Sequence, residues 1–82
     1  MSSDEFYEKY ELFLEEGHYG LNIDIPDVVE YLDAKFQSFI TVPDFSYSQI
    51  KKKFGHGRFY CEGLSTQVVR EVEEKITELC KT

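Results

Sequence analysis

Long apolar runs are missing from this chain of 82 residues. No segment approaches the roughly 18 uninterrupted apolar residues of a membrane span. The opening residues M-S-S-D-E-F contain neither the basic segment nor the apolar segment of an export signal. We therefore expect a cytoplasmic protein that does not span a membrane.

Cysteine is also scarce, with Cys61 and Cys80 as the two thiols. Two such distant cysteines cannot form a disulfide framework or a zinc knuckle, and a reducing cytosol keeps them as thiols. His18 and His56 lie in glycine-containing turns and have neither a neighbouring nucleophile nor a second pair of metal ligands. Glycine-rich phosphate loops are absent as well. We expect free, partly buried cysteines, no metal, no cofactor and no enzymatic activity.

Positive charge is in short supply and is unevenly placed. The chain has 9 Lys and Arg against 16 Asp and Glu, a net charge of -7. Residues 51 to 58 hold four of these bases and no acid, which leaves five bases against sixteen acids in the rest of the chain. Acids spread over most of the surface repel phosphates, so broad nucleic-acid binding is not expected.

A chain of this length forms one domain, which we place at residues 1–82, with a single modest core. Seven Phe and six Tyr supply much of the apolar area that this core needs.

Three segments have the apolar spacing of amphipathic helices. The first is residues 3–16, with a capping-box pattern at Ser2 and Glu5 and Gly17 as the stop. The second runs from Pro26 to about residue 38, and the third covers residues 66–80. Their buried stripes are predicted to contain Phe6, Tyr10, Phe13, Leu14, Val29, Leu32, Phe36, Phe39 or Ile40, Val69, Val72, Ile76 and Leu79. The alternation of Leu21, Ile23 and Ile25 between the first two helices is compatible with a short strand, but one alternating pentapeptide is a weak signal, and we expect an extended connection there.

Residues 46–62 permit two structures. A capping-box pattern at Ser46 and Gln49 with Gly55 beyond the lysines is typical of a short helix over 47–54. The alternation of the residues around Tyr47 and the G-H-G turn before R-F-Y-C-E favour a hairpin instead. We therefore predict an α+β fold with about three helices packed on a two-stranded antiparallel hairpin, and an all-α fold as the alternative.

The segment Q-I-K-K-K-F-G-H-G-R-F-Y at residues 49–60 resembles a pattern, Q-I-K-E-K-F-G-G-L-R-F-Y, found in a group of small uncharacterised phage and bacterial proteins. The resemblance covers about twelve residues, and Lys52, His56 and Gly57 depart from it. Members of the group tend to continue with a helix and C-E-x-C-G, whereas Cys80 is followed here by Lys-Thr. The resemblance implies a hairpin and a phage or bacterial setting, with the host cytoplasm as the location of a phage protein.

The candidate binding residues are Lys51, Lys53, His56, Arg58 and Tyr60. In a hairpin, Lys51 and Lys53 project to one face and Lys52 to the other. Arginine and lysine beside exposed glycine amides and an aromatic ring suit a phosphate or a carboxylate. The structural alternative is that these bases pair with acids of the helices and that lysines on an edge strand prevent aggregation.

Three functional hypotheses follow. In the first, a host or partner protein docks against the basic hairpin and Tyr60. In the second, the same residues sequester a small anionic, nucleotide-like ligand. In the third, an acidic face formed by Glu5, Glu8, Glu11, Glu15 and Glu16 on the first helix mimics DNA. Surface tyrosines at Tyr7 and Tyr19 also suggest homo-oligomerisation through the helices.

Overall fold

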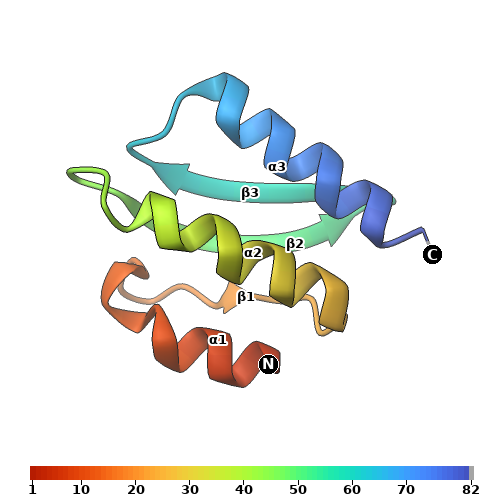
Figure 1. The fold of residues 1–82 in the computed structure, drawn as a ribbon, viewed down its shortest axis with the longest axis horizontal. Helices are drawn as coiled ribbons and strands as arrows, with labels where there is room; N and C mark the ends of the chain where they lie inside the picture. Colours follow the sequence, from red (N-terminus) through yellow and green to blue (C-terminus); the bar gives the residue numbers. More distant parts are fainter. Residues whose placement is uncertain (82) are drawn as a thin grey trace.

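The computed structural model describes residues 1–81. These residues form helices that pack on one small β-sheet (Figure 1). The elements in chain order are α1 (Ser3–Lys9), the short 3-10 helix η1 (Glu11–Phe13), β1 (Gly20–Leu21), α2 (Pro26–Phe39), β2 (Ser46–Lys53), β3 (His56–Glu62) and α3 (Thr66–Leu79). The predicted α+β class is confirmed, and the all-α alternative is wrong because residues 47–53 lie in strand β2.

The sheet has three strands rather than the predicted two, in the order β1-β2-β3. β2 and β3 pair antiparallel, as predicted, but β1 adds a parallel strand on the other side of β2. Burial explains the extra strand, because Leu21 is buried beside its partner Ile50. The amide of Asn22 continues the pairing by donating to the carbonyl of Ile50 at 2.8 Å.

The first helix ends at Lys9, well before the predicted stop at Gly17. The capping box of Ser2 and Glu5 is present as expected, so the start of the helix is confirmed. Beyond it, the chain leaves the helix to run along β2, where the Glu15 amide donates to the Tyr47 carbonyl at 2.8 Å. A tertiary pairing with a distant strand has therefore overridden the local helical pattern.

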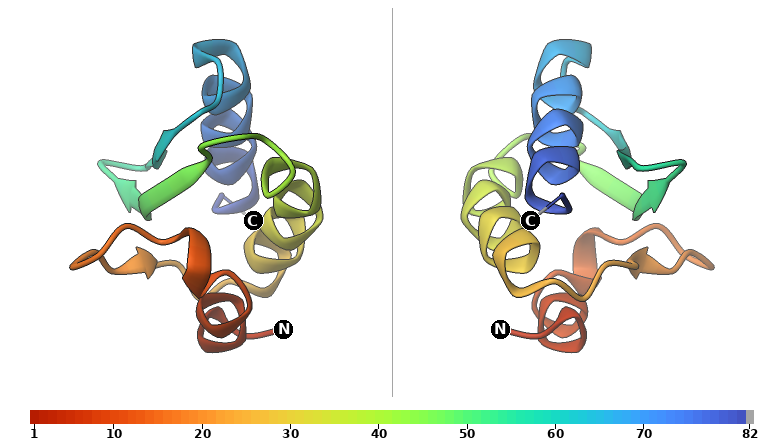
Figure 2. Two further views of the ribbon diagram at one scale, coloured as in Figure 1. Left: turned by 90° about the vertical axis from the view of Figure 1, so that its left-hand side faces the viewer. Right: turned by 90° about the vertical axis from the view of Figure 1, so that its right-hand side faces the viewer.

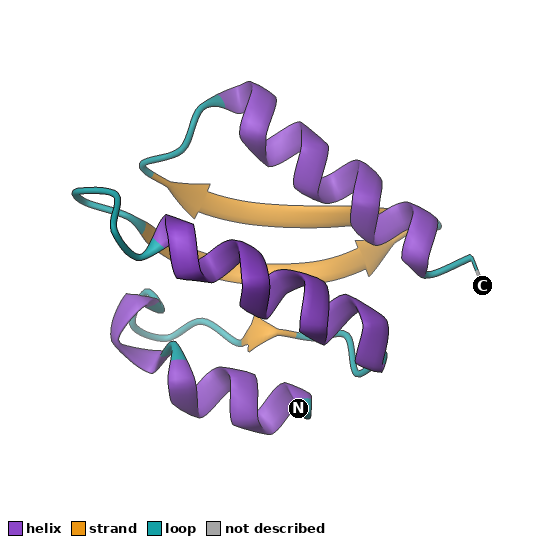
Figure 3. Cartoon of the chain, in the orientation of Figure 1, coloured by secondary structure: helices purple, strands orange, loops and turns teal. Residues whose placement is uncertain are grey.

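The two longer helices agree with the sequence predictions to within a residue. Pro26 opens α2, and the hydroxyl of Ser65 caps α3 by accepting from the Val68 amide at 3.3 Å. Figures 2 and 3 show both helices on the same side of the β2–β3 hairpin, so the other side of the hairpin is left uncovered. We call this uncovered side the open face.

The core between the helices and the sheet is mainly aromatic. The ring of Phe36 lies at its centre, 4.9 Å from the rings of both Phe6 and Tyr10 and 5.1 Å from that of Tyr47. Most of these pairs are tilted or edge to face, which suits the charge distribution of aromatic rings. The fully buried residues include Phe6, Val28, Val29, Leu32, Phe36, Tyr47, Ile50 and Ile76.

α3 closes the outer edge of β3. A Cβ at Gly57 would lie 2.7 Å from the Glu73 carbonyl oxygen and 2.7 Å from the Ile76 Cβ, so only glycine permits this close approach. The outward amide of Gly57 donates to Thr77 Oγ1 at 2.7 Å, and that of Phe59 donates to Glu73 Oε2 at 3.0 Å. Side chains of α3 thus accept hydrogen bonds from backbone amides of β3 that would otherwise be free to pair with another strand.

Neither helix length nor hydropathy suffices for a membrane crossing anywhere in residues 1–81. Both cysteines are free and partly buried, as predicted. Burial raises the pKa of the Cys61 thiol to about 11, and the carboxylates of Glu62 and Glu73 act in the same direction.

Candidate functional site

The strand register places all five predicted site residues on the open face. Lys51 lies directly opposite Arg58, and Lys53 lies opposite His56. Tyr60 follows Arg58 by two residues and therefore projects to the same side. Lys52 lies opposite buried Gly57 and points to the helix side, so the predicted alternation of the lysines is confirmed.

The hairpin turn lies at Phe54 and Gly55, not at the predicted G-H-G. Both turn residues have positive φ, 52° for Phe54 and 79° for Gly55, and Asn or Gly is the usual first residue of such a turn. The Phe54 side chain is 88% exposed, and its ring lies 5.6 Å from Lys53 Nζ. Sequence reasoning missed this aromatic tip because it placed the turn at the G-H-G that follows Phe54.

The predicted exposure of the Gly57 amide is wrong. Gly57 is a buried strand residue, and its amide is already bonded to Thr77. The hairpin therefore offers no run of free glycine amides for a phosphate, and recognition at this place depends on side chains.

The bases of the hairpin form no ion pair with any carboxylate of the described residues. Three ion pairs are found within residues 1–81, Met1 with Glu30, Lys9 with Asp33 and His18 with Glu15, and none includes Lys51, Lys52, Lys53 or Arg58. The interpretation that these bases pair with acids of the helices therefore has no direct ion pair among residues 1–81 to support it. Aromatic rings are the neighbours instead, since Lys51 Nζ lies 5.8 Å from the centre of the Tyr60 ring.

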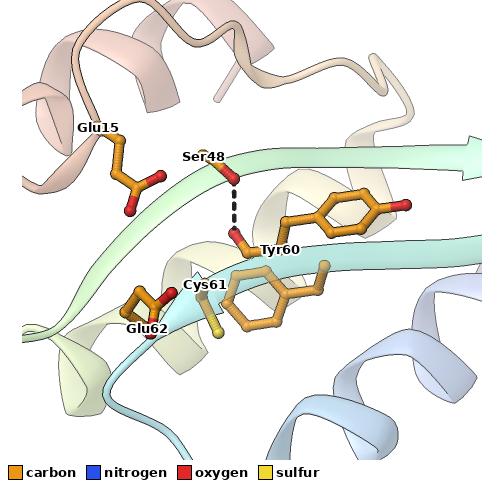
Figure 4. Close-up of a pocket in the computed structure, with 6 residues that line it drawn as sticks. Glu15, Ser48, Tyr60, Cys61 and Glu62 are labelled. Atoms are coloured by element: carbon orange, nitrogen blue, oxygen red, sulfur yellow. Dashed lines mark hydrogen bonds between the residues drawn. The ribbon is translucent and has the colours of Figure 1, made fainter.

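Opposite charge gathers at the other end of the open face. Figure 4 shows Glu15 and Glu62 beside Ser48 and Tyr60 around an open depression of about 260 Å³. Ser46 holds Glu15 in place by donating from Oγ to Oε1 at 3.4 Å. No sequence pattern indicated this acidic end, because Glu15 reaches it only after the first helix has ended early.

Bases do not line the two depressions found in the structure. The second, of about 300 Å³, lies where the first helical segment turns towards β1 and is lined by Tyr7, Glu11, Leu14, Glu15, Glu16, Gly17 and His18. Carboxylates in both depressions oppose the binding of a small anion. Within residues 1–81 no three potential metal ligands lie close enough together to hold an ion.

The acidic face proposed for DNA mimicry is not continuous. Glu5 and Glu8 lie on α1, Glu11 lies on η1, and Glu15 and Glu16 follow after the helical segments have ended. The prediction of one helix face carrying all five acids is therefore wrong. The surface tyrosines are as expected, since Tyr7 and Tyr19 are both exposed.

The geometry thus brings together a basic end, a central tyrosine and an acidic end on one open sheet face. Comparisons of this chain with protein-family models, with curated proteins and with solved structures give no match.

Proposed function

We propose that this chain is a non-enzymatic binding protein whose basic hairpin recognises an acidic surface of a partner protein. The observation that carries the proposal is the pair Lys51 and Arg58, two like charges placed directly opposite each other, neither of which forms an ion pair with a carboxylate of residues 1–81. Such a pair opposes sheet formation by roughly 0.2–1 kcal/mol. Carboxylates of a partner would remove this repulsion on binding.

Exposed aromatic residues give the same surface an apolar component. Tyr60 is 44% exposed beside Lys51, and Phe54 extends from the tip of the hairpin. Aromatic and arginine side chains supply much of the binding energy in protein interfaces. A protein surface is favoured over a nucleotide-like ligand because neither of the two depressions described above is lined by Lys or Arg. The resemblance to phage and bacterial proteins makes a bacterial host protein the first class to test.

The experiment is native mass spectrometry of the tagged protein recovered gently from a bacterial lysate. We compare the wild type with Lys51→Glu/Arg58→Glu and with the control Lys35→Glu/Arg70→Glu, which changes two exposed helix bases by the same total charge. We expect a bound protein with the wild type and the control, and its loss with the hairpin variant. Equal capture by the hairpin variant would exclude this surface.

Phe54→Asn separates binding from folding in the same experiment. Asparagine adopts positive φ more readily than phenylalanine, so the variant is expected to unfold at the same or a higher temperature. Reduced capture by this stable variant would assign the loss to the aromatic tip. A small anionic mass that is retained by the wild type and lost with Arg58→Ala would favour the nucleotide-like ligand instead.

A further inference from the structure

The open face is polarised along strand β3. Arg58, Tyr60 and Glu62 alternate with inward residues, so they lie in a row on this face with Tyr60 in the middle. On the neighbouring strand, Lys51 lies beside Arg58, and Ser46 with its hydrogen-bonded carboxylate Glu15 lies beside Glu62. One end of the face is therefore basic on both strands, and the other end is acidic.

A two-fold axis through the middle of this row would place Arg58 and Lys51 of each copy against acidic residues of the other. Arg58 and Glu62 are each two residues from Tyr60, about 7 Å along the strand. Rotation about an axis across the strands places Arg58 of one copy on Glu62 of the other, and Lys51 on the acidic end near Glu15. Tyr60 then meets Tyr60. The surface is self-complementary, which is the requirement for a symmetric dimer.

We infer that a second copy of this chain binds to the open face through this charge-matched arrangement. The inference rests on the proposed function, since it names one partner for the same surface. It differs from homo-oligomerisation through the helices because it uses the sheet. A second copy cannot add a strand at the edge of β3, because the edge amides of Gly57 and Phe59 already donate to the side chains of Thr77 and Glu73.

The test is sedimentation of the purified chain over a concentration series at low and high salt. The wild type is expected to form a dimer that weakens as salt rises, because the contacts are ionic and close to solvent. Arg58→Glu and Glu62→Lys should each raise the dimer dissociation constant at least about tenfold, since each change acts twice in a symmetric interface. Lys35→Glu, on the exposed surface of α2, is the control that should leave the dimer unchanged.

Mixing the two single variants gives the decisive result. In a dimer of one Arg58→Glu chain and one Glu62→Lys chain, both contacts join opposite charges again, so the equimolar mixture should dimerise although neither variant does alone. If either variant proves unfolded by circular dichroism, Lys51→Glu and Glu15→Lys provide the same complementation on the neighbouring strand. A mixture that stays monomeric, or variants that dimerise like the wild type, would overturn the inference.

The outcomes also separate this inference from the proposed function. A wild type that is monomeric at every concentration, yet captures a bacterial protein through the hairpin bases, overturns the symmetric dimer and leaves the proposed function standing. A monomer that captures nothing overturns both. Restored dimerisation of the mixture supports the inference whether or not a foreign protein is captured.

Discussion

Two buried tyrosines of the aromatic core differ in whether the hydroxyl has a hydrogen-bond partner. The hydroxyl of Tyr10 donates to Asp33 Oδ1 at 2.5 Å and accepts from Gln37 Nε2 at 2.7 Å. The hydroxyl of Tyr47 is the one buried side-chain polar atom without a hydrogen-bond partner among residues 1–81. Burial raises the pKa of Tyr47 to about 12, and the nearby Tyr7 and Glu11 act in the same direction.

The two tyrosines should therefore respond oppositely to loss of the hydroxyl. Tyr47→Phe removes an unsatisfied group and is expected to leave the free energy of unfolding unchanged or to raise it by about 1 kcal/mol. Tyr10→Phe removes satisfied bonds and is expected to lower it by about 1–2 kcal/mol. Urea unfolding of both variants measures the difference. A clear loss of stability in Tyr47→Phe would show that its hydroxyl has a partner in solution.

At the scale of single residues, the chemical type of the site residues was easier to predict than the position of each residue in the hairpin. The five site residues were identified from their charge and their spacing in a hairpin, and the strand register places them on one face. Phe54 was missed because its positive φ contradicts the preferences of an aromatic side chain. Glycine signals identified a turn in this region but placed its start one residue too late, at Gly55 instead of Phe54.

At the scale of elements, the contact between α3 and β3 fixes the position of the hairpin. Gly57 permits the helix to approach, and Thr77 uses its one hydroxyl twice, accepting from the Gly57 amide and donating to the Glu73 carbonyl at 2.8 Å. The edge of β3 is thus closed by side chains rather than by another strand. Loss of this arrangement would expose a pairing edge.

Replacing Thr77 tests this edge closure. Thr77→Val keeps the shape of the side chain but leaves the buried Gly57 amide without an acceptor, which should cost about 1–3 kcal/mol. Thr77→Ser retains the hydroxyl and is expected to lose much less. Thermal unfolding should show a midpoint several degrees lower for the valine variant, and light scattering should show its greater tendency to aggregate. Equal midpoints for the two variants would contradict the proposed role of the hydroxyl.

The elements that sequence reasoning missed all depend on distant partners. α2 and α3 were predicted closely because their caps and apolar stripes are local signals. The early end of α1 follows from pairing with β2, which no window of local sequence contains. The alternation of Leu21, Ile23 and Ile25 is a weak local signal for a strand, and pairing with β2 decides that Gly20 and Leu21 form β1. The acidic end of the open face depends on the same pairing, since it brings Glu15 beside Ser46.

At the scale of the whole molecule, α1 is attached to the rest of the fold through a charged cluster around Asp33. Lys9 Nζ lies 2.9 Å from Asp33 Oδ1, and the hydroxyl of Tyr10 donates to the same oxygen. Burial alone would raise the pKa of Asp33, but the hydrogen bonds from Lys9 and Tyr10 outweigh it and hold the pKa below the usual value of 3.8.

This cluster should make stability depend on pH in the acid range. A carboxyl with a lowered pKa contributes stability that is fully present above its unfolded pKa and is lost as pH falls through its folded pKa. We expect the unfolding midpoint to fall as pH drops below about 4 and the fall to be smaller in Asp33→Asn. Thermal unfolding between pH 7 and pH 2 measures both curves. Parallel curves would show that Asp33 does not contribute to the acid loss.

The parallel pairing of β1 with β2 sets an order of events during synthesis. β2 and β3 are joined by a two-residue turn and can close as soon as both have left the ribosome. Gly20 and Leu21 are synthesised long before their partners Gln49 and Ile50, so the N-terminal segment cannot pair with the sheet until β2 has been synthesised. During that interval apolar side chains such as Phe6 and Leu21 have no sheet to cover them, so they stay exposed to solvent in the nascent chain.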